Sequence, residues 1–67
     1  MVNTAKIKER MKQLGIRQSD VASCLGIQQA TANQKINNVR CLSLAEADKM
    51  QRLLGITAEE FASYFFA

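Results

Sequence analysis

Five amide side chains gather in one short stretch near the middle of the chain. Residues 28–37 read QQATANQKIN, and only a few apolar residues stand among the amides. An amide presents a hydrogen-bond donor and an acceptor together, which matches N6 and N7 of adenine in the major groove of DNA. The methyl group of Ala30 is suited to contact a thymine methyl. The alternative reading is a solvated helix face, on which amides are common.

Helical spacing places the amides on one side. At about 100° per residue, the apolar positions Ala32 and Ile36 fall on the opposite face. A helix with so narrow an apolar seam gains little from packing, so most of its surface is left for solvent or a partner. The outer stripe and its leading end comprise Gln28, Gln29, Ala30, Asn33, Gln34 and Asn37.

The basic residues are concentrated in the first part of the chain. Residues 1–40 hold seven basic and two acidic side chains (+5), whereas residues 41–67 hold two basic and four acidic ones (−2). This asymmetry suggests that one face meets a polyanion, although a solvated basic face explains it equally well. Arg17, Lys35 and Arg40 flank the amide stretch and are the better phosphate candidates. Solubility and phosphate contact explain equally well the remaining basic residues of this part, Lys6, Lys8, Arg10 and Lys12.

The sequence contains no candidate residues for catalysis or for metal binding. The chain has no histidine, no serine or cysteine beside a base and no phosphate-cradling glycine loop. Cys24 and Cys41 are too few for a zinc cluster and are expected to be free thiols. We therefore expect no enzyme activity, no metal, no cofactor and no small-molecule substrate. No apolar run approaches the roughly 20 residues of a membrane span, and the N-terminus lacks a signal-peptide core, so we expect a cytoplasmic protein.

Repeated helix-end and helix-start signals predict the helices of a single domain over residues 1–67. Leu-Gly-Ile occurs at 14–16, 25–27 and 54–56, and this pattern is typical of a helix that ends on a left-handed glycine. Capping boxes at Ser43–Glu46 and Thr57–Glu60 predict two helix starts. The expected helices cover about 4–14, 18–25, 28–37, 44–54 and 58–66.

The apolar spacing of these helices predicts one shared core. Phe61 and Phe65 lie four residues apart and are expected to close it, which would leave Tyr64 and Phe66 partly exposed. The other inward positions are expected to be Ile7, Met11, Leu14, Val21, Ala22, Leu25, Leu44, Ala47, Met50, Leu53 and Leu54.

The short turn around Gly26, with these flanking residues, resembles a known family. The helix-turn-helix spacing of the Cro and repressor (XRE-like) family of phage and bacterial regulators is matched by Gln18, Ala22, Leu25, Gly26, Ile27, Thr31 and Ile36. The resemblance extends from about Ile7 to Phe66. Within this family, the chain is similar to small phage Cro-like proteins. The resemblance implies an all-α, compact five-helix lambda-repressor-like domain, with the helix-turn-helix formed by the helices over 18–25 and 28–37.

The resemblance also implies a function and a site. It implies a sequence-specific transcriptional regulator, of phage or prophage origin, that lays the helix over 28–37 in the major groove of a double-stranded DNA operator. Base contacts are expected from Gln28, Gln29, Ala30, Asn33 and Gln34. Backbone contacts are expected from Arg17, Gln18, Lys35, Asn37 and Arg40. An alternative is the same fold used for protein binding, as an antitoxin-like or repressor-sequestering module.

Several residues depart from the family pattern. Ala32 stands where a larger side chain is usual, Arg17 replaces a capping Ser or Thr, Asn38 replaces a glycine and Gln34 a frequent arginine. Regulators of this type often pair on a two-fold axis, so that two helices meet successive major grooves about 34 Å apart. We expect such a homodimer to use the last helix, through Tyr64 and Phe66.

Overall fold

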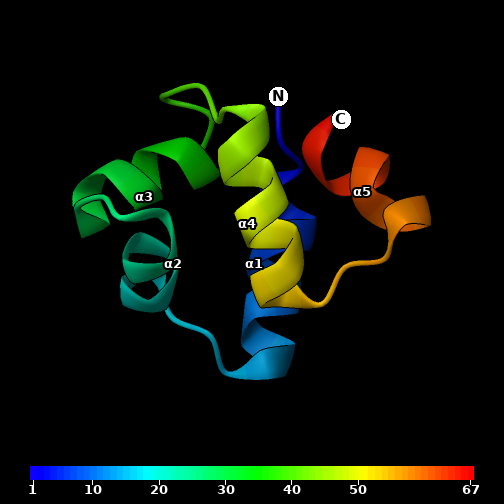
Figure 1. Ribbon diagram of the computed structural model, residues 1–67, viewed down its shortest axis with the longest axis horizontal. Helices are drawn as coiled ribbons and strands as arrows, with labels where there is room; N and C mark the ends of the chain where they lie inside the picture. The colour runs from blue at the N-terminus through cyan, green and yellow to red at the C-terminus, as the bar shows by residue number, and fades with distance from the viewer.

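The chain folds into five α-helices without a strand. The computed structural model describes residues 1–67 and is drawn in Figure 1. The helices are α1 (Thr4–Leu14), α2 (Gln18–Leu25), α3 (Gln29–Ile36), α4 (Leu44–Leu54) and α5 (Ala58–Phe65). The predicted all-α, five-helix architecture is confirmed, and α3 begins one residue later than expected because Gln28 is its N-cap.

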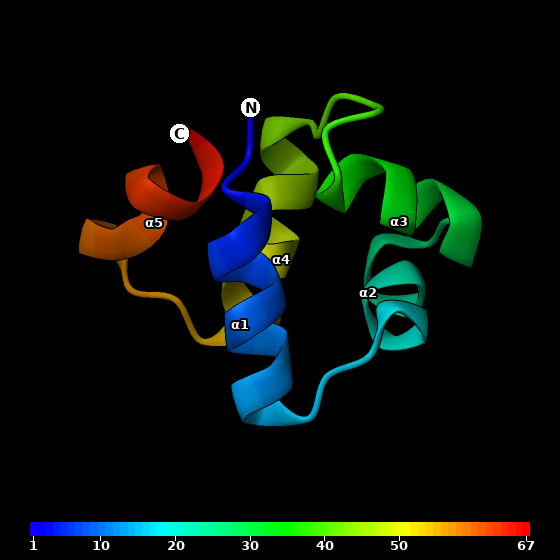
Figure 2. The ribbon, with the colours of Figure 1, turned by 180° about the vertical axis from the view of Figure 1, so that it is seen from behind.

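The helices enclose one core, with α3 and α5 at its two ends. α2 packs on α3 and α4, while α1 packs on α4 and α5. α3 and α5 lie at opposite ends of the longest dimension of 29 Å, as the front and back views both show (Figures 1 and 2). The core residues are Val2, Ile7, Met11, Val21, Ala22, Leu25, Ala32, Ile36, Ala47, Met50, Leu54, Ile56, Tyr64 and Phe65.

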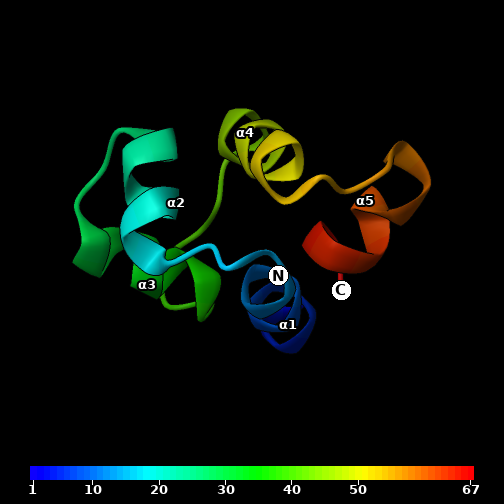
Figure 3. The ribbon, with the colours of Figure 1, turned by 90° about the horizontal axis from the view of Figure 1, so that it is seen from below.

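The turn between α2 and α3 has the geometry that the Leu-Gly-Ile pattern predicts. Gly26 adopts φ = 67°, a left-handed conformation that costs glycine no side-chain clash. The N–H of Ile27 then donates to the carbonyl of Ala22 at 3.0 Å and satisfies an orphan group of the helix end. The same glycine conformation ends α1 and α4. Viewed from below, α2 and α3 therefore form a compact pair at one side of the α1–α4 pair (Figure 3).

Asn38 fastens the end of α3 to the start of the chain. It is the one residue other than glycine with positive φ, at 62°. Its Oδ1 accepts from the Val2 N–H at 2.8 Å, and its Nδ2 donates to the Val2 carbonyl at 3.0 Å. The asparagine that replaces the usual glycine thus keeps the left-handed conformation and adds three hydrogen bonds to the start of the chain, two to Val2 and one to Thr4 Oγ1.

Three burial predictions are wrong. Leu14 is 44% exposed, because the last turn of α1 extends beyond the neighbouring helices (Figures 1 and 2). Leu44 is 70% exposed, because as the first residue of α4 it lies at the rim of the core. Tyr64 is only 9% exposed and belongs to the core, and the Lys6 ammonium lies 4.4 Å from its ring centroid.

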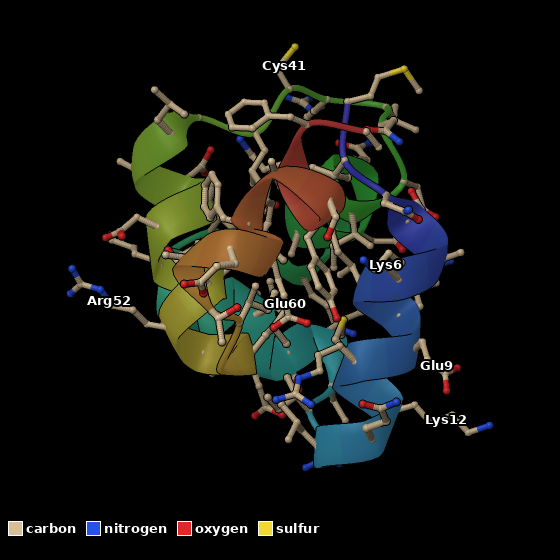
Figure 4. The ribbon with its side chains drawn as sticks, turned by 90° about the vertical axis from the view of Figure 1, so that its right-hand side faces the viewer. Lys6, Glu9, Lys12, Cys41, Arg52 and Glu60 are labelled. Carbon is tan, nitrogen blue, oxygen red and sulfur yellow. The ribbon has the colours of Figure 1, made fainter.

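Phe61 and Phe65, which were both expected to close the core, are buried to different extents. Phe65 is buried, whereas Phe61 is partly buried and packs against it with ring centroids 4.8 Å apart. Both cysteines are free, and Cys41 is exposed at the edge of the molecule that is uppermost in Figure 4. No helix is long and apolar enough to cross a membrane.

Candidate nucleic-acid interface

α3 buries one narrow seam and exposes Gln29, Ala30 and Asn33. Ala32 and Ile36 are its only buried residues. The small Ala32 side chain lets the helix lie close to α2, and it is fully buried there. Because α3 also lies at one end of the molecule, its outer face is open along its length (Figure 1).

The first turn of α3 presents unoccupied amides. Gln28, Gln29 and Ala30 are all exposed. Neither glutamine makes a side-chain hydrogen bond to the rest of the chain, so each keeps both its donor and its acceptor for a partner. This is the state that paired recognition of an adenine edge requires.

Asn33 lies at the centre of a chain of amides. Gln18 Nε2, on the first turn of α2, donates to Asn33 Oδ1 at 2.9 Å. Asn37 Nδ2 donates to the same oxygen at 2.8 Å and to the Asn33 carbonyl at 2.8 Å. Gln18 therefore braces α3 from α2, and Asn37 holds Asn33 from the other side.

Gln34 and Arg40 are joined across the end of α3. Arg40 Nε donates to Gln34 Oε1 at 2.6 Å, and the carbonyl of Gln34 accepts from the N–H groups of Val39 and Arg40. Arg40 is exposed, whereas Gln34 is half-buried. The remaining guanidinium donors of Arg40 are free for an anion.

A shallow basic hollow adjoins the start of α3. It lies between α1, the start of α2 and the N-terminal end of α3 and is lined by Lys8, Met11, Lys12, Ile16, Arg17, Gln18 and Gln29. Three cations, Lys8, Lys12 and Arg17, thus share one surface, which also holds the predicted contact residues Gln18 and Gln29. Figure 4 shows the Lys12 side chain extending away from the body of the molecule.

Lys8 and Lys12 are the residues that the sequence analysis did not single out. The four basic residues of α1 divide into two pairs spaced four apart, and the pairs face different ways. Arg10 Nε donates to the Leu54 carbonyl at 2.8 Å and Lys6 Nζ to Ser63 Oγ at 2.8 Å, so that pair ties α1 to the C-terminal part of the chain. The i, i+4 spacing indicates that each pair shares one side of α1, but it does not tell which pair lies beside α3.

Comparison with known proteins agrees with this geometry. Residues 7–61 match the model of the helix-turn-helix family. The chain belongs to the Cro and repressor type of that family. It is thus a DNA-binding helix-turn-helix protein of a regulatory class. No curated protein and no solved structure matches it significantly.

In this helix-turn-helix protein, Lys35 was predicted to contact the DNA backbone, but its ammonium group is bound within the protein. Lys35 Nζ lies 2.8 Å from Glu46 Oε1, with only 15% and 18% of the two side chains exposed, and it also donates to the Cys41 carbonyl at 3.1 Å. Glu46 in turn accepts from the Ser43 N–H in the predicted capping box. The Lys35 hydrogen bond holds the pKa of the Glu46 carboxyl below its ordinary value. Lys35 thus closes the α3–α4 loop.

Arg17 leaves α2 without a side-chain cap, as expected of a residue that replaces the usual Ser or Thr. The Asp20 carboxylate accepts from the Arg17 N–H at 2.8 Å, which supplies half of a capping box for α2. The Arg17 side chain is consequently free and exposed. No group of three or more histidine, cysteine, aspartate or glutamate residues is placed to hold a metal ion.

Proposed function

We propose that this helix-turn-helix protein is a sequence-specific transcriptional regulator of phage or prophage origin. It places α3 in the major groove of an operator and blocks polymerase by occupying that site. The observation that carries the proposal is the exposed start of α3, where Gln28 and Gln29 keep unoccupied donor–acceptor pairs beside a basic hollow. An amide pair of this kind distinguishes adenine from the other bases.

Phosphate contacts on both sides of α3 would fix its register on the duplex. At the leading end, Lys8, Lys12 and Arg17 line the hollow with Gln18 and supply its positive charge. At the trailing end, Arg40 supplies the corresponding cation, with Asn37 beside it. Lys35 contributes indirectly, by holding the loop that carries Arg40.

Base contacts are proposed for the outer stripe of α3. Gln29 and Ala30 project from the first turn, Gln28 precedes it, and Asn33 and Gln34 follow one turn later. Ala30 is exposed next to Gln29 and would meet a thymine methyl.

A homodimer is proposed on a surface that differs from the one expected. Buried Tyr64 cannot serve, whereas Phe66 is 60% exposed and lies beside an apolar hollow of about 260 Å³. Exposed Met1, Val39 and Leu44 belong to the same surface. A pair joined only through the far side of α5 would separate two α3 helices by more than one DNA turn, because α5 lies at the other end of the 29 Å axis. The hollow includes the α3–α4 loop and is nearer to α3.

The test is binding to duplex DNA from the upstream region of its own gene, measured over a series of salt concentrations against a random duplex. Operator binding should weaken steeply as salt rises, because each phosphate contact releases counterions. It should also retain a large preference over the random duplex. Binding that is equally weak on both duplexes would contradict the proposal.

The same apolar hollow favours a second candidate, a protein-binding module on this fold. Its exposed side chains form a patch of the kind that marks a partner surface. If this candidate is correct, substitutions in the hollow should abolish the function of the protein. Substitutions of Gln28 and Gln29 should leave that function unchanged.

A further inference from the structure

The side-chain oxygen of Asn33 has no acceptor capacity left. An amide oxygen offers two lone pairs. Gln18 Nε2 occupies one at 2.9 Å and Asn37 Nδ2 the other at 2.8 Å. Asn33 is nevertheless an exposed residue on the outer face of α3, so only its two N–H donors remain for a partner.

We infer that Asn33 reads DNA as a donor-only side chain and selects guanine, with Gln18 and Asn37 as the positioning residues that set this preference. The inference rests on the proposed function. Guanine presents two acceptors in the major groove, N7 and O6, whereas adenine presents an acceptor and a donor, and cytosine presents a donor. Two N–H groups match the guanine edge, while the N6 donor of adenine would find no acceptor on Asn33.

α3 therefore carries two kinds of amide. Gln28 and Gln29 make no hydrogen bond to the chain and can turn to suit adenine. Asn33 is held from two directions, by α2 and by the residue that ends α3, so turning its amide would break both hydrogen bonds. Gln34 is intermediate, because Arg40 occupies one of its two lone pairs. The DNA half-site that α3 recognises should therefore have adenine at Gln28 and Gln29 and guanine at Asn33, which lies one α-helical turn further along α3.

The experiment selects bound duplexes from a randomised pool, using the full chain and three variants. Asn33→Ala identifies the base pair that Asn33 reads, because the preference is lost at that position alone. At that position the unaltered protein should prefer guanine over adenine by about tenfold, within the usual discrimination of one amide contact. Gln18→Met combined with Asn37→Ala releases the Asn33 oxygen and should bring the two bases close to equal.

The variants are checked for folding by circular dichroism, and the single variant Asn37→Ala replaces the double one if the latter does not fold. That single change frees one lone pair and should lower the guanine preference part of the way. Ser19→Ala is the matched control, since Ser19 lies on the same turn as Gln18, is exposed and makes no side-chain hydrogen bond. A general weakening of DNA binding alters all positions equally, whereas the inferred effect changes one.

Three results would overturn the inference and leave the proposed function standing. They are a preference for adenine at the Asn33 position, a guanine preference that persists in the double variant, and no position that responds to Asn33→Ala. If the unaltered protein selects no sequence at all, the proposed function itself is wrong.

Discussion

The Lys35 ammonium lies 2.8 Å from the Glu46 carboxylate and links the last turn of α3 to the first turn of α4. Both side chains are mostly buried, and Glu46 also caps α4 through the Ser43 N–H. The pair fixes the loop that carries Arg40. The position of the proposed DNA-reading helix therefore depends on a carboxylate outside the helix-turn-helix.

Acid should weaken the fold through Glu46. Its folded pKa lies below the ordinary value of 4.5, so the stabilisation is complete above that value and is lost as the pH falls through the folded pKa. Glu46→Gln should lower the free energy of unfolding by about 1 kcal/mol at pH 7 and much less at pH 3. Urea unfolding at the two pH values measures this. Asp48→Asn is the control, since Asp48 pairs with Arg52 in solvent and should have no measurable effect.

Asn38 should be difficult to replace. Asn38→Ala loses both hydrogen bonds to Val2 and places an alanine at φ = 62°, where a left-handed conformation costs roughly 1–2 kcal/mol. Asn38→Gly loses the same hydrogen bonds without that clash. Urea unfolding should rank the stabilities as Asn38, then glycine, then alanine, and an alanine variant as stable as the glycine variant would contradict the conformational argument.

The buried seam of α3 should tolerate no enlargement. Ala32→Leu adds three carbons where the side chain is fully buried and should destabilise the protein by about 1–3 kcal/mol. Ala30→Leu, on the exposed face of the same helix, should change stability by less than about 0.5 kcal/mol. If Ala30→Leu nevertheless weakens binding to the selected DNA site, the two faces have the separate roles assigned to them.

Self-association should depend on Phe66. Phe66→Ser removes an exposed aromatic side chain from the edge of the apolar hollow and should shift a dimer toward monomer while leaving the fold intact. Leu14→Ser is a matched control, since Leu14 is exposed but lies outside that hollow. Sedimentation velocity at high micromolar protein, with and without DNA, measures the effect. A monomeric mass for the unaltered protein under both conditions would contradict the proposed dimer.

The sequence predicts helix ends better than it predicts side-chain surroundings. The three Leu-Gly-Ile triplets and the two capping boxes act within a few residues, so their effect can be deduced locally, and the structure confirms each of these helix ends. The exposure of Leu14 could not be deduced, because helical spacing gives the side on which a residue lies but not how far its partners extend. The burial of Tyr64 could not be deduced either, because its ring meets Lys6 of α1, which is distant in sequence.

The candidate site was predictable to a similar degree. The outer stripe of α3 follows from its spacing, and the structure places those residues where the spacing requires. The involvement of Lys35 with Glu46, and of Asn33 with Gln18 and Asn37, depends on how the loop and α2 pack, so residue type and spacing alone do not determine it.

The most direct test of the central claim compares the unaltered protein with Gln29→Ala on two duplexes, a site selected by the protein and an unrelated sequence. If α3 reads bases, the substitution should cost about 1–3 kcal/mol on the selected site and nothing measurable on the unrelated one. Gln13→Ala, on α1, should match the unaltered protein on both duplexes. If Gln29→Ala also binds the selected site as tightly as the unaltered protein does, the start of α3 does not read DNA.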